Sequence, residues 1–205
     1  MARYKDSVCK LCRNEGAKLF LKGSRCDTPK CAIERRNYRT GQHGNARKKL
    51  SEYAMQLREK QKVKRLYGMS EKQFHKNYVI ATHKKGVTGT LMLQGLESRL
   101  DNVVYRSGIV ASRAQSRQLI GHGHFLVNGR KVDIPSFRVK PGDLLTVRPA
   151  SHKLFKSMLE GRTPLVAHWV ETDFDNLTLK FKGLPERQDL DPTLKEALII
   201  EFYSR

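Results

Sequence analysis

The sequence predicts an α+β protein in which a mostly helical body carries a small antiparallel sheet. Apolar residues recur at three- and four-residue spacing through residues 50–95, which predicts amphipathic helices. Short apolar segments follow residue 120, where Asn-Gly and Pro-Gly pairs mark tight turns between strands. Four cysteines in the first 31 residues form a pattern typical of a metal-binding knuckle.

The charge balance indicates a polyanionic partner. The 205 residues include 40 Lys and Arg against 20 Asp and Glu, for a formal net charge of +20. Such an excess favours a form bound to phosphate groups. Residues 1–49 hold fourteen basic and four acidic residues, residues 50–150 hold eighteen and seven, and residues 151–205 hold eight and nine. We expect the first two regions to face nucleic acid and the last to pack internally or meet another protein.

Composition also excludes several classes of protein. Hydrophobic residues make up 39% of the chain, too many for a wholly disordered basic tail. The first ten residues lack the apolar stretch of a signal peptide, and no segment approaches the ~18 uncharged apolar residues of a membrane span. We therefore expect a cytoplasmic protein without a membrane partner. Thiols stay reduced in that compartment, so the cysteines are better explained as metal ligands than as disulfides.

The four cysteines are Cys9, Cys12, Cys26 and Cys31. Their spacing, C-x2-C-x13-C-x4-C, suits four thiolates that close on one ion. Four protein ligands leave no open position for water, so we expect a structural zinc ion, which would supply the ordering energy that so short a segment lacks. An iron–sulfur cluster on the same cysteines is one alternative, and four unlinked thiols that only pack are another. A zinc deaminase is disfavoured because no H-x-E motif accompanies a P-C-x-x-C motif.

Basic and planar side chains surround the cysteines and follow them. Residues 32–49 mix arginines with amides and glycines, a composition suited to following a folded RNA backbone at close range. A solvated basic loop is the alternative. The candidate RNA contacts here are Lys10, Arg13, Lys22, Arg35, Arg36, Arg39, Gln42, His43, Gly44 and Arg47.

Two helices are predicted next. Residues 47–67 carry apolar side chains at helical spacing with lysines and arginines between them, and Gly68 ends the segment. Ser70-Glu71-Lys72-Gln73 is a capping box that opens the second helix. The charges on the first helix indicate a cationic outer face, although such a face often serves only solubility. Its candidate RNA contacts are Tyr53, Arg58, Lys60, Lys62 and Arg65.

Residues 97–148 predict a compact module. Apolar residues from 91 to 104 predict a helix that closes near Gly108, and Ser112 opens another that runs to Ile120. Asn128-Gly129 predicts a hairpin with a type I′ turn, and a last strand is expected at 144–148. Two helices and a small curled sheet could therefore read RNA through phosphate and 2′-hydroxyl groups. The candidate RNA contacts of this module are Arg113, Gln115, Arg117, Gln118, His122, His124, Asn128 and Lys131.

The neutral C-terminal part predicts packing rather than RNA contact. Residues 151–159 predict a short amphipathic helix, and residues 177–181 alternate as a strand does. Trp169 is expected in a core rather than under a base, because its nearest basic neighbours are Arg162 and Lys180.

These residues resemble a known family. Residues 98–105, 112–120 and 124–132 are similar to the small RNA-binding domain, or alpha-L motif, named after small-subunit ribosomal protein S-four. The flanks also resemble the bacterial, cysteine-containing form of that family, so that the resemblance covers essentially the whole chain. The similar flanking segments are the cysteine region, Gly41–Gly44, Tyr53–Gln61, Tyr67–Phe74 and Ile200–Arg205. The family usually has a proline pair before Gly-Gln-His-Gly, where this chain has Arg39-Thr40, which alters the stiffness of the loop.

The resemblance implies a structural constituent of the small (30S) ribosomal subunit. It implies a primary binder of small-subunit (16S-type) rRNA that nucleates assembly of the subunit body and contributes to translational accuracy. The implied partners are that RNA, neighbouring small-subunit proteins and messenger RNA where it enters the subunit, with no small-molecule substrate. The expected domains are a metal-binding basic region at 1–45, a helical body at 46–95, the RNA-binding module at 96–150 as an insertion, and a C-terminal segment at 151–205 that packs back on the body.

An RNA-modifying enzyme that docks through the same module is the main alternative function. The flanks of the module offer no catalytic Asp in an apolar strand, no nucleotide-binding Gly loop and no nucleophile with a base. We therefore expect no enzymatic activity. A stress or rescue factor on released subunits is a third alternative, which would associate at less than one copy per subunit.

Overall fold

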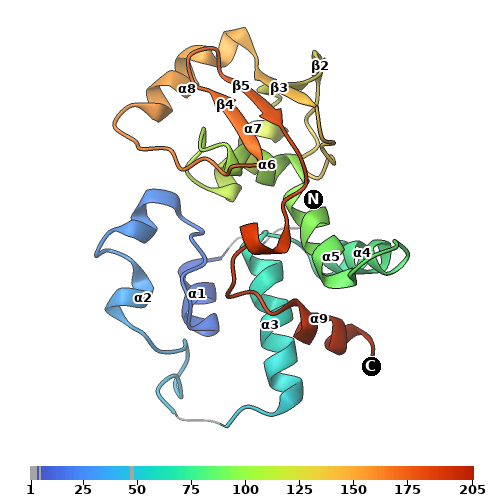
Figure 1. Ribbon diagram of the computed structural model, residues 1–205. Helices are drawn as coiled ribbons and strands as arrows, with labels where there is room; N and C mark the ends of the chain where they lie inside the picture. Colours follow the sequence, from blue (N-terminus) through green and yellow to red (C-terminus); the bar gives the residue numbers. More distant parts are fainter. Residues whose placement is uncertain (1–3, 5, 47–48) are drawn as a thin grey trace. The chain divides into compact units, whose positions relative to one another are not determined.

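The computed structural model describes residues 4, 6–46 and 49–205. Among these residues are nine α-helices, three short 3-10 helices and five strands in one antiparallel sheet (Figure 1), which confirms the predicted α+β class. The chain forms two compact units. Unit 1 comprises Met1–Leu93 and Leu190–Arg205, and unit 2 comprises Gln94–Asp189. No described helix combines the length and the apolar character that crossing a membrane requires.

Unit 1 is helical in its described part. Its short elements near the cysteines are α1 (Cys9–Glu15), η1 (Gly23–Asp27) and α2 (Ala32–Arg35). Its longer helices are α3 (Glu52–Leu66), α4 (Glu71–Thr82), the first part of α5 (Thr88–Glu97) and the C-terminal α9 (Glu196–Tyr203). The helices α3 and α9 pack side by side although they are far apart in the sequence (Figure 1).

Local signals set the ends of α3 and α4. Ser51 Oγ accepts a backbone N–H at 3.3 Å, so α3 begins at Glu52 rather than at residue 47. Gly68, with a φ of 61°, lets the chain leave α3. Ser70 Oγ accepts the backbone N–H of Gln73 at 3.5 Å, which confirms Ser70 as the predicted N-cap of α4.

One carboxylate joins α3, α4 and α9. Glu71, in the first turn of α4, accepts hydrogen bonds from Lys60 Nζ at 2.8 Å and Lys64 Nζ at 3.0 Å. It also accepts the hydroxyl of Tyr203 at 2.7 Å. Partial burial raises the pKa of Glu71, but the hydrogen bonds from these three groups together outweigh burial and lower the pKa to about 2.

Replacing Glu71 by Gln is expected to flatten the acid dependence of stability. The pKa of Glu71 is about 2 in the folded chain against an ordinary value of 4.5. The stability that its charge contributes is therefore complete above about pH 4.5 and disappears as the pH falls toward 2. The side chain is 45% exposed, so solvent screening limits the loss at pH 7 to about 1 kcal/mol.

Urea denaturation at several pH values between 2.5 and 7 measures this effect. The difference in unfolding free energy between the wild type and Glu71→Gln should shrink with acidity. A matched control is Glu52→Gln, an exposed carboxylate on α3. An unchanged difference from pH 7 down to pH 3 would contradict the role of the carboxylate.

Unit 2 consists of a sheet with helices packed against it. Its helical elements are α6 (Leu100–Arg106), α7 (Arg113–Gly121), η2 (Pro149–Ser151), α8 (His152–Leu159) and η3 (Arg187–Asp189). Its strands are β1 (Phe125–Val127), β2 (Arg130–Lys131), β3 (Leu144–Val147), β4 (Val170–Asp173) and β5 (Thr178–Phe181), in the order β2-β1-β3-β5-β4. Asn128 and Gly129 have φ values of 48° and 78°, which confirms the predicted type I′ hairpin turn between β1 and β2. Phe155 of α8 meets Phe125 of β1 edge to face, with ring centroids 5.4 Å apart.

The structure divides the helix that was expected to close near Gly108. It has α5 and α6 instead, because the chain is extended at Arg99, whose ψ is 141°. Arg99 forms an isolated β-bridge with Arg138, and the backbone N–H of Leu100 donates to Phe137 O at 2.8 Å. The partner segment lies far along the chain, so apolar spacing alone did not reveal the break.

The structure also divides the segment expected at 151–205. Only Leu190–Arg205 belongs to unit 1, whereas residues 151–189 belong to unit 2. The reason is strand pairing, because β5 pairs with β3, with Leu145 opposite Leu179, and β4 pairs with β5. Trp169, expected in a core, is buried and lies just before β4. The module expected at 96–150 thus shares its sheet with the two strands that follow it.

Candidate metal centre and nucleic-acid interface

The four cysteines surround one small cavity in unit 1. Cys9 and Cys12 come from α1, Cys26 from η1, and Cys31 immediately precedes α2. None of them is in a disulfide. The backbone N–H of Lys22 donates to Cys26 Sγ at 3.4 Å, a contact that favours a thiolate. Burial raises the pKa of Cys12 and of Cys26, so these thiols stay protonated at neutral pH until a cation displaces their protons.

The donor chemistry of this cavity fits a metal ion, although the side chains do not converge on one point. Within residues 4, 6–46 and 49–205, no three Cys, His, Asp or Glu side chains form a group that could hold a metal. The cavity is nonetheless lined by all four thiols, and Lys22 and Arg25 also line it. Two cations beside four thiolates would offset the negative charge of a tetrathiolate site. The predicted zinc knuckle therefore stays a prediction.

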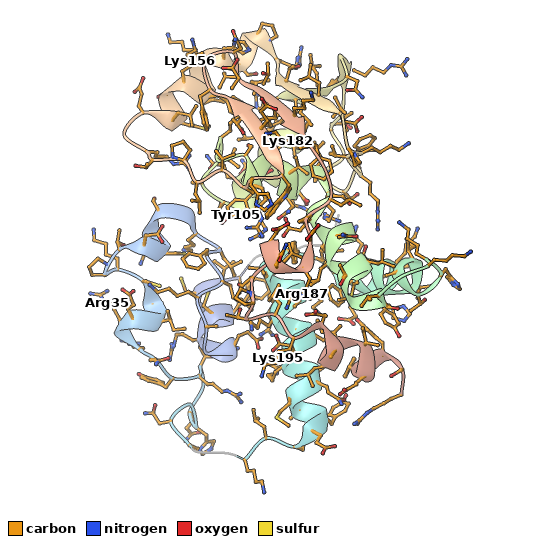
Figure 2. All side chains as sticks on the ribbon, viewed as in Figure 1. Arg35, Tyr105, Lys156, Lys182, Arg187 and Lys195 are labelled. Atoms are coloured by element: carbon orange, nitrogen blue, oxygen red, sulfur yellow. The ribbon has the colours of Figure 1, made fainter. Side chains whose placement is uncertain are left out.

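Most of the predicted RNA contacts in the first 46 residues are exposed. They are Lys10, Lys22, Arg35, Arg36, Arg39, Gln42 and His43 (Arg35 is labelled in Figure 2). Gly44 is half-buried, and Arg47 lies outside the described residues. Arg13 is also half-buried, because it donates to the backbone carbonyl groups of Tyr38 and Arg39. Its guanidinium group is thus engaged within unit 1.

The predicted cationic outer face of α3 is largely neutralised inside unit 1. Arg58 and Arg65 both contact Glu15 of α1, whose side chain is 2% exposed. Burial raises the pKa of Glu15, while Arg65 and Arg58 oppose that effect. Lys62 Nζ is 3.2 Å from Glu59 Oε1 and also donates to a backbone carbonyl at 2.6 Å.

Lys60 requires the clearest correction on this helix. It is only 5% exposed, pairs with Glu71, and lies over the ring of Phe202 at 4.6 Å from the centroid. Lys60 is thus engaged inside unit 1, which argues against the direct RNA contact expected from the sequence. Tyr53 remains 51% exposed, with its ring centroid 5.7 Å from that of Phe202. Apart from Glu59, these acidic and aromatic partners come from α1, α4 and α9, so the sequence of α3 alone could not reveal them.

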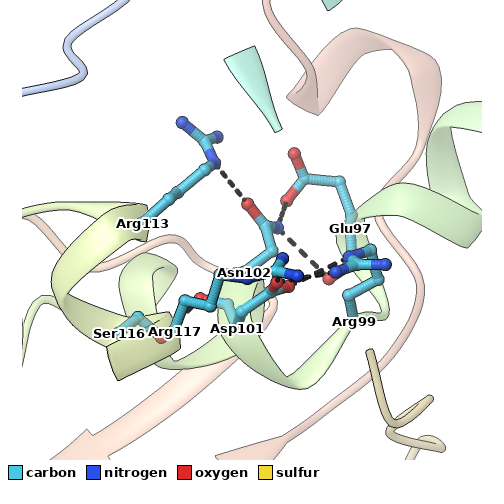
Figure 3. Close-up of polar contacts among 7 residues, drawn as sticks. All are labelled: Glu97, Arg99, Asp101, Asn102, Arg113, Ser116 and Arg117. Atoms are coloured by element: carbon cyan, nitrogen blue, oxygen red, sulfur yellow. Dashed lines mark hydrogen bonds and ion pairs between the residues drawn. The ribbon is translucent and has the colours of Figure 1, made fainter. Parts of the chain in front are cut away.

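A polar network in unit 2 engages the two arginines expected to read RNA from α7 (Figure 3). Arg113 Nε donates to Asn102 Oδ1 at 2.7 Å, and Arg117 Nη1 lies 3.2 Å from Asp101 Oδ2. Ser116 Oγ of α7 donates to the carbonyl of Asp101 at 2.6 Å. The two arginines therefore join α7 to α6 before any RNA is present.

The same network continues from α6 to the end of α5. Asn102 Nδ2 donates to Glu97 Oε2 at 2.5 Å, and Arg106 Nη2 is 2.8 Å from Glu97 Oε1. Arg99 contacts Asp101 through two hydrogen bonds of 3.0 and 2.7 Å. Glu97 is fully buried, so its charge depends on these partners.

The other predicted contacts of unit 2 fall into two groups. Gln118, His122 and Lys131 are exposed. Gln115 accepts the backbone N–H of Ala111 at 2.9 Å, and Asn128 stabilises its own turn by accepting the N–H of Leu144 at 2.9 Å. These two amides have structural partners.

His124 is a poor candidate for a cationic contact. Burial, His122 and Arg148 lower the pKa of His124, which keeps its imidazole neutral at pH 7. Its Nδ1 lies 2.8 Å from Ser151 Oγ. Arg148, which sequence reasoning missed, is exposed and donates to Gly123 O at 3.4 Å. Its only sequence signal is its place at the end of a predicted strand.

Comparison with known proteins identifies the family. Residues 3–97 match the family described as "Ribosomal protein S4/S9 N-terminal domain", and residues 98–145 match the S4 domain. The small ribosomal subunit protein uS4 of Gloeobacter violaceus is 56% identical to the chain over 206 residues, with all of both chains covered. The chain belongs to the uS4 family. The uS4 proteins of Pelotomaculum thermopropionicum and Thermus thermophilus are each 53% identical, again over their full lengths.

The family assignment confirms the resemblance to this ribosomal protein family over the full chain, whereas the zinc-binding form stays a prediction. The boundary between the two matched domains, after residue 97, coincides with the break between α5 and α6 in this uS4 chain. A ribosomal protein of this family is a structural protein and not an enzyme. The match to the uS4 S4 domain ends at residue 145, within β3, and thus before the strands β4 and β5.

Proposed function

We propose that this uS4 chain binds small-subunit rRNA as a structural component of the cytoplasmic ribosome. The observation that carries the proposal is the separation of its cations into two sets. The cations of α3 and α7 have acidic or amide partners within their units, whereas most of those around the cysteines and along the hairpin remain exposed. Exposed cations are the groups that neutralise the phosphates of an RNA and release its counterions.

The proposed RNA surface has one part on each unit. On unit 1 it consists of Lys10, Lys22, Arg35, Arg36, Arg39, Gln42 and His43. On unit 2 it consists of Gln118, His122, Arg130, Lys131 and Arg148. Exposed cations on both units suit a protein that contacts several helices of a folded RNA and so stabilises their junction. The resemblance to the family, rather than the geometry, leads us to include in the proposal early binding to naked rRNA, which nucleates assembly of the subunit body, and a contribution to translational accuracy. Contacts with neighbouring ribosomal proteins and with messenger RNA where it enters the subunit belong to the same proposal.

We further propose that the four cysteines hold a structural zinc ion. Cys9, Cys12, Cys26 and Cys31 would each supply one thiolate, and the ion would supply ordering energy to a segment with a small apolar core. Support comes from their common cavity and the N–H donor on Cys26. An iron–sulfur cluster on the same thiols is the alternative, which an absorbance spectrum and elemental analysis of the purified protein distinguish.

Removing exposed cations of unit 1 should reduce both RNA affinity and its salt dependence. For Arg35→Ala with Arg36→Ala and Arg39→Ala, we expect the slope of log K against log salt to fall by about 1 for each phosphate that the variant no longer neutralises. Filter binding of the full chain to small-subunit rRNA between about 50 and 200 mM salt measures the slope.

A variant with two substituted lysines in the charge-balanced region is the control. Lys180→Ala with Lys182→Ala also removes exposed cations, but from the part of the chain where basic and acidic residues are nearly equal in number. We expect it to change the slope by less than the arginine variant. Equal losses in the two variants, or a flat salt dependence of the wild type, would contradict the proposed surface.

In purified ribosomes an integral component should approach one copy per small subunit, which separates it from a factor that binds transiently.

A further inference from the structure

We propose that Arg13 and Asn14 are positioning residues that hold the loop of residues 38–44 in the conformation in which its exposed side chains meet RNA. This loop is called the clasped loop below. The inference rests on the proposed function, since it explains how one part of the RNA surface is oriented. It also gives Arg13 a role different from the direct RNA contact expected from the sequence.

Four hydrogen bonds connect the end of α1 to the clasped loop. Asn14 Oδ1 accepts both the backbone N–H of Thr40, at 3.3 Å, and its hydroxyl, at 2.7 Å. Arg13 Nε donates to Tyr38 O at 2.9 Å, and its Nη2 donates to Arg39 O at 3.3 Å. The Arg13 guanidinium carbon also lies 4.8 Å from the centroid of the Tyr38 ring. Three successive residues of the loop are thus bound by two successive residues of α1.

The backbone of the clasped loop folds back tightly on Arg39, whose carbonyl group accepts a hydrogen bond from Arg13. Gly41 has a φ of 106°, and the N–H of Gly44 donates to Gly41 O at 3.2 Å. A Cβ atom added to Gly44 would overlap the carbonyl oxygen of Arg39. Only glycine permits this close approach of backbone to backbone. The loop therefore has a compact, defined path although it contains no helix or strand.

Within the clasped loop, the side chain that α1 holds differs in exposure from those that face solvent. Thr40 is half-buried, as is its partner Asn14 on α1, whereas Arg39, Gln42 and His43 are exposed. A loop that is ordered before binding loses less conformational entropy when it meets its partner. Threonine matters at position 40 because proline has neither an N–H nor a hydroxyl to donate. The hydrogen bonds to Asn14 thus stiffen a loop that lacks the proline pair.

Arg13 and Asn14 are connected to the rest of unit 1 through the residue that follows them. Glu15, the residue after Asn14, has a buried side chain that contacts Arg58 and Arg65 of α3. The end of α1 therefore connects the clasped loop to the longest helix of unit 1. A loop attached in this way keeps a fixed place on unit 1, which a flexible basic loop would not.

The test is a double-mutant cycle on RNA affinity with the full-length protein and small-subunit rRNA. One change is Asn14→Ala, and the other is the triple change Arg39→Ala, Gln42→Ala and His43→Ala, which removes the exposed side chains. If Asn14 acts by positioning them, Asn14→Ala should weaken binding about fivefold in the wild type, as expected for the loss of two hydrogen bonds. In the triple variant the same change should have an effect of less than about twofold.

Two further variants and one control complete the experiment. Thr40→Val removes the 2.7 Å hydroxyl bond with little change of shape and should weaken binding, whereas Thr40→Ser should restore it. The matched control is Asn37→Ala, an exposed asparagine just before the loop, which should leave affinity unchanged. Hydrogen exchange of the Thr40 amide, expected to accelerate in Asn14→Ala, reports directly on the anchored bond.

The outcomes separate this inference from the proposed function. Absence of RNA binding by the folded wild type would overturn the proposed function itself. Normal wild-type binding with equal losses from Asn14→Ala in both backgrounds, or no loss in either, would overturn the positioning role. If Asn14→Ala does not fold, Thr40→Val in the same two backgrounds decides in the same way.

Discussion

Replacing Cys26 by Ser is expected to release the metal ion from the full-length protein and to unfold the segment around it. A serine hydroxyl is a weak ligand for zinc compared with a thiolate, and structural zinc sites supply about 10–16 kcal/mol of apparent binding free energy in short peptides at neutral pH. The buried apolar side chains near the site are few, with Leu11, Leu19 and Ile33 below 9% exposure. We therefore expect this segment to need the proposed zinc ion for its order.

Elemental analysis and hydrogen exchange measure the two parts of this result. Metal content should fall from about one ion per chain toward zero, and amides in α1 and α2 should exchange faster. Ser24→Ala is the control, because Ser24 is an exposed residue of η1 beside Cys26. If the serine variant keeps its metal, Cys26 is not a ligand.

The cysteine variant should also affect RNA binding, through the geometry of α1. Cys9 and Cys12 lie on α1, the same helix that carries Arg13 and Asn14. Disorder in α1 would release the clasped loop without altering any of its exposed side chains. We therefore expect the RNA affinity of Cys26→Ser to fall by at least as much as that of Asn14→Ala.

The features that the sequence predicted well are those set by neighbouring residues. The type of the hairpin turn depends on Asn128 and Gly129, since they are among the residues that adopt positive φ readily. The starts of α4 and α7 depend on Ser70 and Ser112, whose side chains cap the adjacent backbone N–H groups. Such signals act over three or four residues and are visible in any stretch of sequence.

The features that the sequence did not predict depend on partners far along the chain. The cationic face expected on α3 is neutralised by Glu15 and Glu71, which come from other helices. The end of α5 depends on the bridge from Arg99 to Arg138, and the sheet of unit 2 includes strands from beyond residue 150. Net charge along the sequence therefore located the basic regions but could not tell which cations face solvent. For the candidate RNA surface, this distinction decides between a contact and an internal ion pair.

Removing the charge of Glu97 is expected to produce the largest loss of stability in unit 2. Its side chain is fully buried and holds Arg106 Nη2 at 2.8 Å and Asn102 Nδ2 at 2.5 Å. Breaking a fully buried pair by removing one partner costs about 3–5 kcal/mol, because the remaining charge stays buried without compensation. The Arg106 side chain is 26% exposed, so water compensates part of its charge, and for Glu97→Ala we expect a loss near the lower end of this range. Asn102 would also lose the partner that orients it toward Arg113 of α7.

Urea denaturation of the full-length chain, followed by Trp169 fluorescence, measures the loss, because Trp169 is the only tryptophan and lies in unit 2. The control is Glu171→Ala, whose side chain is 60% exposed and lies 3.7 Å from Lys182 Nζ. An exposed pair of this kind contributes at most about 1 kcal/mol.

The variant Glu97→Ala with Arg106→Met distinguishes a charge effect from a packing effect. Removing both charges takes away the uncompensated guanidinium group, so the double variant should lose less stability than the sum of the two single variants. Arg106 also lies over the ring of Trp169, at 5.4 Å from its centroid, and methionine retains apolar contact there. Additive losses would mean that Glu97 stabilises unit 2 by filling space rather than through its ion pair with Arg106.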